Sequence, residues 1–170
     1  MLETAYAKSL PRLILVLTLA AIGCGGDVPD PVNAVQPKTE ILGRLDTSLI
    51  DEASGVAISR KFPDRLYLHN DSGGGPYFYL STYSGDQAQR VEIAGYDDAG
   101  QDLEDIAIGK CAIGPNDCIF LGNIGVNFLR RDSIEILVIE EQERFETSVR
   151  PIRRIRLVYP DGAHNAEGLA

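Results

Sequence analysis

Five acidic residues recur at similar places along the chain and could together bind a cation. They lie beside short apolar runs, at the expected ends of strands or in adjacent turns: Glu52, Asp71, Glu104, Asp105 and Glu167. Converging carboxylates repel one another unless a cation lies between them, and oxygen ligands of this kind suit Ca²⁺. We therefore expect a calcium site, to which Asn70, Asn123 and Asn165 could add neutral oxygens. The alternative is that these residues only shape turns.

Other residue types associated with catalysis occur, but their spacing does not favour it. His69, Asp71 and Ser72 have the side chains of a catalytic triad, yet neighbours along a strand point to opposite faces. The glycines at 73–75 are not followed by the Lys and Ser/Thr of a phosphate-binding loop, so they predict a turn. The one basic concentration is expected to face solvent, with aliphatic residues alternating among its arginines, and an anion site is the alternative; its members are Arg130, Arg131, Arg150, Arg153, Arg154 and Arg156. We expect no catalytic residue, and an enzyme is the less favoured interpretation.

The beginning of the chain has the features of an export signal. Residues 1–23 carry Lys8 and Arg12 before an apolar run at 13–22. A membrane-spanning helix needs about 20 apolar residues, so this run is too short to span. It is typical of a signal peptide.

The residues around the first cysteine resemble a lipobox, the cleavage motif of bacterial lipoproteins. The small Gly23 precedes Cys24, and Ala21 stands where Leu is more usual. The resemblance implies cleavage before Cys24, lipidation of its sulfur and a stable anchor of several acyl chains. Gly25, in place of Asp, implies sorting to the outer membrane in a cell that has two membranes. An ordinary secretory signal with a chance cysteine is the alternative.

The remaining cysteines, Cys111 and Cys118, flank a turn-forming segment between two apolar runs. A hairpin there would place them opposite one another, within reach of a disulfide. An exported protein enters an oxidising compartment, so we expect the bridge to form. A metal site is the alternative, but it lacks a second Cys or His pair nearby.

The part of the chain after the anchor region repeats a set of short strands. A small or acidic pair followed by an aliphatic residue and Ala occurs at 54–57, 104–107 and 167–170, at intervals of 50 and then 63 residues. An apolar run that ends in Asn follows the first two, at 66–70 and 119–123. Further strands are expected at 77–83, 89–93, 134–140 and 152–159. Four antiparallel strands per unit at this spacing are typical of β-propeller blades.

The repeat sets the expected domain organisation. Residues 24–39 are rich in Gly, Pro, Asp and Asn and predict a flexible tether between the lipid and a domain at 40–170. That domain would contain two blades and the first strand of a third. Closed propellers have about four to eight blades, so we expect an all-β, incomplete propeller and a longer protein. The alternative is a complete small β-sandwich.

The strand-end residues resemble those of secreted bacterial β-propeller proteins, mostly of unassigned function. The similar segments are Ser-Gly-Val-Ala at 54–57, Asn-Asp-Ser-Gly at 70–73, Glu-Asp-Ile-Ala at 104–107, Gly-Asn-Ile-Gly-Val-Asn at 122–127 and Pro-Asp-Gly with Asn-Ala-Glu at 160–167. The resemblance covers about residues 45–170 and implies a propeller fold. It extends more distantly to phytase-like and esterase-like propellers, whose acidic channel mouths often hold Ca²⁺.

The chain departs from the pattern of these proteins at three positions. Leu103 stands where Trp is usual, and Asn123 and Val126 stand where Asp is usual. Two carboxylates are therefore missing from the loop that would be the most acidic. The departures weaken the expectation of a metal site on that loop and leave the expected fold unchanged.

The net charge of the chain limits the classes of partner that we expect. The formal charge is −9, and an acidic surface repels phosphate backbones, so we expect no nucleic-acid partner. The expected partners are the membrane, through the Cys24 lipid, and an unknown protein or small molecule. The sequence thus predicts a lipid-anchored binding or scaffold module of the cell envelope. One alternative is a Ca²⁺-dependent hydrolase, phytase-like or esterase-like, whose metal would activate water. Another is a truncated fragment without independent function.

Overall fold

The computed structural model describes residues 38–71, 73–96, 102–126, 131–162 and 164–169. The chain divides into two units, residues 1–39 and 40–170, and the fold given below is that of the second. The predicted signal peptide at 1–23, the lipidation site Cys24 and nearly all of the tether lie outside the described residues.

Strands are the only regular elements in the described part of the chain, where no helix is present. They are β1 (Ala53–Ile58), β2 (Leu66–Asn70), β3 (Tyr77–Ser81), β4 (Gln89–Ile93), β5 (Leu103–Lys110), β6 (Asp117–Asn123), β7 (Ile134–Glu140), β8 (Ser148–Val149) and β9 (Arg153–Leu157). The order β1-β2-β3-β4-β8 makes one sheet, here called sheet A, and β5-β6-β7-β9 makes sheet B. Neither sheet closes into a barrel over these residues. The expected all-β fold is confirmed.

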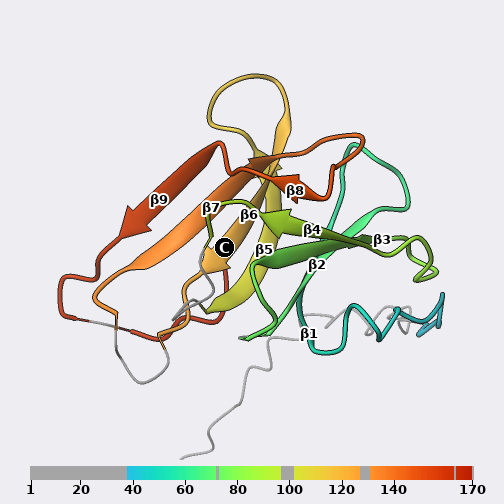
Figure 1. Ribbon diagram of the computed structural model, residues 1–170, viewed down its shortest axis with the longest axis horizontal. Helices are drawn as coiled ribbons and strands as arrows, with labels where there is room; N and C mark the ends of the chain where they lie inside the picture. Colours follow the sequence, from blue (N-terminus) through green and yellow to red (C-terminus); the bar gives the residue numbers. More distant parts are fainter. Residues whose placement is uncertain (1–37, 72, 97–101, 127–130, 163, 170) are drawn as a thin grey trace, which may run out of the picture. The chain divides into compact units, whose positions relative to one another are not determined.

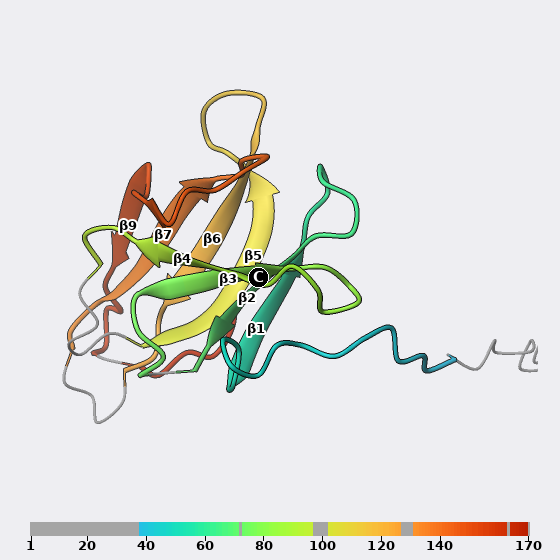
Figure 2. The ribbon, with the colours of Figure 1, turned by 45° about the vertical axis from the view of Figure 1, so that its right-hand side comes forward.

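The two sheets form two layers. Figures 1 and 2 show them from two directions, with β1 of sheet A beside β5 of sheet B. Neighbouring strands are antiparallel except β8, which runs parallel to β4. After β7 the chain crosses to sheet A to form β8, and it then returns to sheet B as β9. This crossing ties the two layers together.

The main core lies between the sheets because each sheet directs one apolar face inward. Residues two apart on a strand share a face, and Ile119 and Leu121 of β6 are both fully buried. Tyr67 of β2 and Phe78 of β3 join them from sheet A. Phe145, between β7 and β8, packs edge-on against Phe78, with ring centroids 5.3 Å apart.

Each sheet is also apolar on the face turned away from the other. On sheet B, Phe120 and Ile136 pack with the buried Val138 in a separate cluster. On sheet A, Leu68 and Tyr79 pack beneath Ile50 of the segment that precedes β1. A sheet with two apolar faces has more surface to bury than one neighbouring layer can cover.

Cys111 and Cys118 form the predicted disulfide at the turn between β5 and β6, with their Cα atoms 5.0 Å apart. The predicted strands are present with small differences in length. The strand expected at 77–83 ends at Ser81, because the chain turns at 82–86, where the backbone N–H of Gly85 donates to the carbonyl of Thr82. β8 was not predicted, because two residues are too few to give a periodic pattern.

Candidate functional site

Three carboxyl groups meet where β5 begins, and two of them belong to the predicted calcium set. The carboxyl group of Glu104 shares hydrogen bonds with those of Asp102 and Glu167. Burial, and then the negative charges of Asp102 and Glu167, raise the pKa of Glu104 to about 8. The group therefore holds a proton at neutral pH. We call these three residues the carboxyl cluster.

A glycine and a hydrogen bond position the carboxyl cluster. The backbone N–H of Asp102 donates to Oδ1 of Asn123, at 2.9 Å, which fixes the approach to β5 against the end of β6. A Cβ added to Gly125 would overlap the carboxyl groups of both Glu104 and Asp102. Only glycine leaves room there for two acidic side chains.

The segment at 164–169 brings Glu167 to the cluster. Oδ1 of Asn165 accepts from the backbone N–H of Val126 at 2.6 Å, and its amide donates to Oε1 of Glu167 at 2.5 Å. Oδ2 of Asp105 accepts from the backbone N–H of Leu169 at 2.7 Å. Asp105 thus holds the backbone of this segment.

Arg131 places a positive charge beside the cluster. Its guanidinium donates to Oδ1 of Asn123 at 2.6 Å and to the carbonyl oxygen of Gly125. These two oxygens would otherwise be available as neutral ligands for a cation. The guanidinium therefore competes with a metal ion for the same loop.

The remaining two predicted ligands lie at the corresponding end of sheet A. Glu52 and Asp71 are exposed, and the backbone N–H of Asp71 donates to the carbonyl oxygen of Glu52 at 2.9 Å. Across the described residues, no group of three or more His, Cys, Asp or Glu side chains is arranged to hold a metal ion. The described donors are thus not arranged as a calcium site, and the calcium site stays an expectation from the sequence alone.

Sequence reasoning missed Asp102, and it expected Arg131 to face solvent, whereas the guanidinium bonds to Asn123 and Gly125. Asp102 could have been found, because it lies two residues before Glu104 and residues at that spacing share a face of a strand. Arg131 lies eight residues after Asn123, and no local pattern connects the two. Its role depends on the tertiary arrangement alone.

His69 is a buried structural residue in the interface between the sheets. Its Nδ1 donates to the carbonyl oxygen of Asn70 at 2.8 Å, and its Nε2 is buried without a hydrogen-bond partner. Burial lowers the pKa of His69 and keeps the ring neutral. A Cβ on Gly55 would overlap the ring. Ser72, the nucleophile of the triad interpretation, lies outside the described residues.

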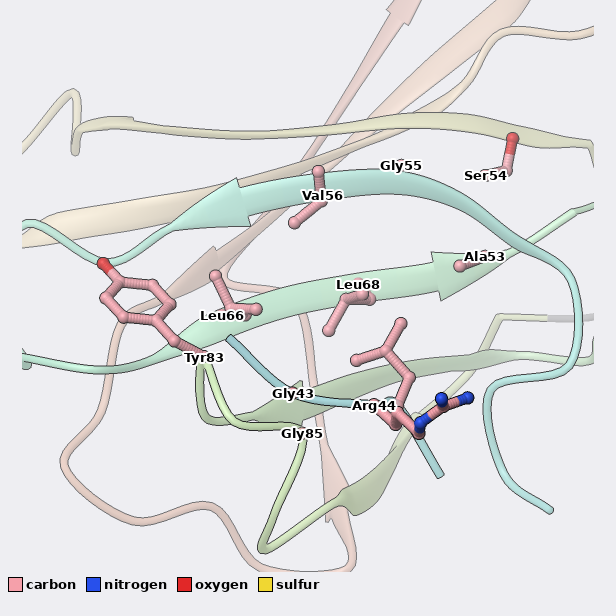
Figure 3. A pocket seen from close by; sticks show the side chains of 11 residues that line it. Gly43, Arg44, Ala53, Ser54, Gly55, Val56, Leu66, Leu68, Tyr83 and Gly85 are labelled. Atoms are coloured by element: carbon pink, nitrogen blue, oxygen red, sulfur yellow. The ribbon is translucent and has the colours of Figure 1, made fainter. Parts of the chain in front are cut away.

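An apolar groove of about 330 Å³ lies on the outer face of sheet A. Figure 3 shows Val56 of β1 and Leu66 and Leu68 of β2 along it, with Tyr83 at one end. The chain at Gly43 and Arg44 forms the opposite wall. The groove is the part of this face that the segment before β1 leaves uncovered.

Comparisons with known proteins give no identification. No family model matches the chain. No curated protein and no solved structure matches it significantly. Among the described residues, no helix has the length and apolar character needed to cross a membrane.

Proposed function

We propose that the protein is a lipid-anchored β-propeller of the cell envelope that acts as a binding or scaffold module. The observation that carries the proposal is the direction in which equivalent residues of the two sheets face. The export signal and the cysteine motif support the proposed location. The acidic composition argues against a nucleic-acid partner.

Sheet A and sheet B are built from corresponding strands, because β1 matches β5 and β2 matches β6 in sequence. Val56 of β1 faces away from sheet B and is 59% exposed. Its counterpart Ile106 of β5 faces sheet A and is 3% exposed. Tyr67 of β2 belongs to the core between the sheets, whereas its counterpart Phe120 of β6 belongs to the outer cluster. Equivalent residues thus face the same way along the stack.

Stacking in one direction is how the blades of a propeller follow one another. A sandwich with two-fold symmetry would instead turn equivalent residues toward each other. When sheets stack with equivalent residues facing the same way, the two ends of the stack expose different faces of the sheet. Here one end is the groove on sheet A, and the other is the face of sheet B that carries Phe120. In a propeller each of these faces is covered by a further sheet.

Leu169 supports the same arrangement. A Cβ added to Gly122 would lie 3.2 Å from Cγ of Leu169, on the outer face of sheet B. A Cβ added to Gly55 would lie 3.1 Å from Cγ2 of Ile106, on the inner face of sheet A. Leu169 and Ile106 occupy equivalent positions in the repeat. A third copy of the repeat would therefore pack on sheet B in the way that sheet B packs on sheet A.

The site favours binding over catalysis. Arg131 engages the oxygens of the loop beside the carboxyl cluster, and burial together with the neighbouring carboxyl groups keeps Glu104 protonated. The cluster also holds the segment at 164–169 in position, which is a structural task.

The anchor is tested by metabolic labelling with palmitate. We expect the wild-type chain to take up the label in a bacterial host and the Cys24→Ala variant to lose it, because the thiol at position 24 is the acceptor. Cys118→Ser is the matched control and should keep the label. Undiminished labelling of Cys24→Ala would contradict the anchor.

The second candidate function is a Ca²⁺-dependent hydrolase, and the crowding of carboxyl groups around Glu104 is the observation in its favour. A calorimetric titration of the full chain with CaCl₂ separates the two candidates. We expect no saturable heat, because Arg131 and the proton on Glu104 both oppose a cation. Saturable binding that disappears in Glu104→Gln and survives in the exposed control Glu92→Gln would favour the hydrolase instead.

A further inference from the structure

A polar pocket of about 590 Å³ lies at the end of sheet A where β2 begins, whereas Glu52 and Asp71 lie where β2 ends. Three segments form it: the turn before β2, the turn between β3 and β4, and the chain between β7 and β8. Its volume is within the range of about 300–1,000 Å³ that small-molecule sites occupy.

The charges in the pocket cancel. Its ionisable lining residues are Asp64, Arg65, Glu143 and Arg144, two acidic and two basic, in a chain whose formal charge is −9. An anionic ligand would meet two carboxylates there, and a cationic ligand would meet two guanidinium groups. The balance favours a neutral ligand.

The uncharged lining residues suit a ligand rich in hydroxyl groups. Gln87 and Gln89 carry both donor and acceptor capacity, as a sugar hydroxyl does. The hydroxyls of Ser81 and Thr82 also line the pocket, where they bond to the turn at 82–86. Phe145 also lines the pocket, although its ring is buried in the core between the sheets.

Hydrogen bonds between its segments hold the pocket open in one shape. The guanidinium of Arg65 donates to the carbonyl oxygens of Gln142 and Glu143 at 2.8 and 2.7 Å. The amide of Gln89 donates to the carbonyl oxygen of Phe145 at 2.9 Å. A preorganised site loses less conformational entropy when a ligand binds.

Two lining residues have backbone conformations that L-amino acids rarely adopt. Asp64 has φ 58° and Gln87 has φ 56°, both in the left-handed region. Glycine would be the least strained residue at either position. The side chain of Asp64 has a structural use, because its Oδ1 accepts from the backbone N–H of Tyr83 at 2.8 Å. Strained non-glycine residues also collect at functional sites, and Gln87 is the residue here to which that reading applies.

We propose that this pocket binds a neutral, hydroxyl-rich saccharide. The proposal gives a ligand class to the binding module described above and rests on that function for its biological setting. The pocket itself is independent of the carboxyl cluster and of the outer faces of the sheets.

The test is a titration followed by NMR on the full ¹⁵N-labelled chain, held in a detergent without sugar head groups. The probes are maltotriose, cellotriose, mannotriose and the trisaccharide of N-acetylglucosamine, with inorganic phosphate and trilysine as charged comparisons. We expect the side-chain amide signals of Gln87 and Gln89 to shift saturably with at least one trisaccharide. We expect neither charged probe to move them.

Three variants assign the binding to the pocket. Gln87→Gly removes a lining side chain and suits the positive φ, so the fold is retained and the affinity falls about tenfold. Arg144→Ala should also weaken binding, whereas Arg150→Ala, an exposed arginine outside the lining, should leave it unchanged.

Several results would overturn the proposal. They are the absence of a saturable shift with every trisaccharide, binding that persists in both Gln87→Gly and Arg144→Ala, and stronger binding of phosphate or trilysine. None of these would alter the palmitate labelling or the stacking of the sheets, so failure of the ligand class is distinguishable from failure of the proposed function.

Discussion

Glu104 is the residue whose ionisation is most tightly connected to the fold. Its carboxyl group hydrogen-bonds with Asp102 and Glu167, and burial together with their charges raises its pKa to about 8 from an ordinary 4.5. The folded chain therefore holds a proton that the unfolded chain releases at a lower pH. This difference favours folding below the unfolded pKa, and the advantage is lost as the pH rises through the folded pKa.

The first prediction at this scale concerns Glu104→Gln. Gln is close in shape to the protonated acid and cannot ionise, so the free energy of unfolding should vary less with pH than in the wild type. Urea unfolding at about pH 5 and about pH 9 measures the difference. The exposed control Glu92→Gln should keep the wild-type dependence. Equal pH dependence in Glu104→Gln and the wild type would contradict the raised pKa.

At the scale of elements, a buried polar network joins the turn before β2 to the chain after β7. Oε1 of Glu141 accepts from Oγ of Ser59 at 2.5 Å and from the hydroxyl of Tyr67 at 3.1 Å. Oγ of Ser59 in turn accepts from the backbone N–H of Phe62 at 2.8 Å. The network fastens sheet A to the segment that carries Phe145 into the core.

Ser59→Ala should destabilise the chain by about 2 kcal/mol, because it removes one of two hydrogen bonds to the buried Oε1 of Glu141 and leaves the backbone N–H of Phe62 without its acceptor. Urea unfolding at neutral pH provides the measurement. Ser48→Ala is the matched control, since its hydroxyl bonds to Asp46 at an exposed site and its loss should cost less than about 0.5 kcal/mol. Equal effects of the two substitutions would show that the network contributes nothing.

The elements were predictable from the sequence where their pattern was local. β2, β4 and β7 are predicted with the observed bounds, because each is a run of strand-forming residues between turn residues. The Cys111–Cys118 bridge followed from the turn between them. β8 was missed because it pairs with β4 from more than fifty residues away, across a chain crossing that no local pattern encodes.

The candidate site was predictable only in part, for the same reason. The repeat located Glu104 and Glu167, which do meet, and it also grouped Glu52 and Asp71 with them. Residues that are equivalent in a repeat are expected at the same place in each sheet. The repeat does not determine whether their side chains, which belong to different sheets, come within contact of one another. Arg131 enters the site from a loop that breaks the repeat.

At the scale of the whole molecule, the direction of stacking is the observation on which the proposed propeller depends. Both outer faces are apolar, and equivalent residues face the same way from sheet A to sheet B. Such a stack can add further sheets at either end. The binding or scaffold role proposed here depends on that architecture, because the ends of the strands are then free to present ligand sites.

The most direct test of the stacking is a methyl NOE experiment on the full chain. The account predicts NOEs from Hα of Gly55 to the γ2 methyl of Ile106 and from Hα of Gly122 to the δ methyls of Leu169, because a Cβ at either glycine would lie against these side chains. An NOE between the rings of Tyr67 and Phe120 would contradict it, since equivalent faces would then meet. Poorly dispersed signals would favour a fragment without independent function.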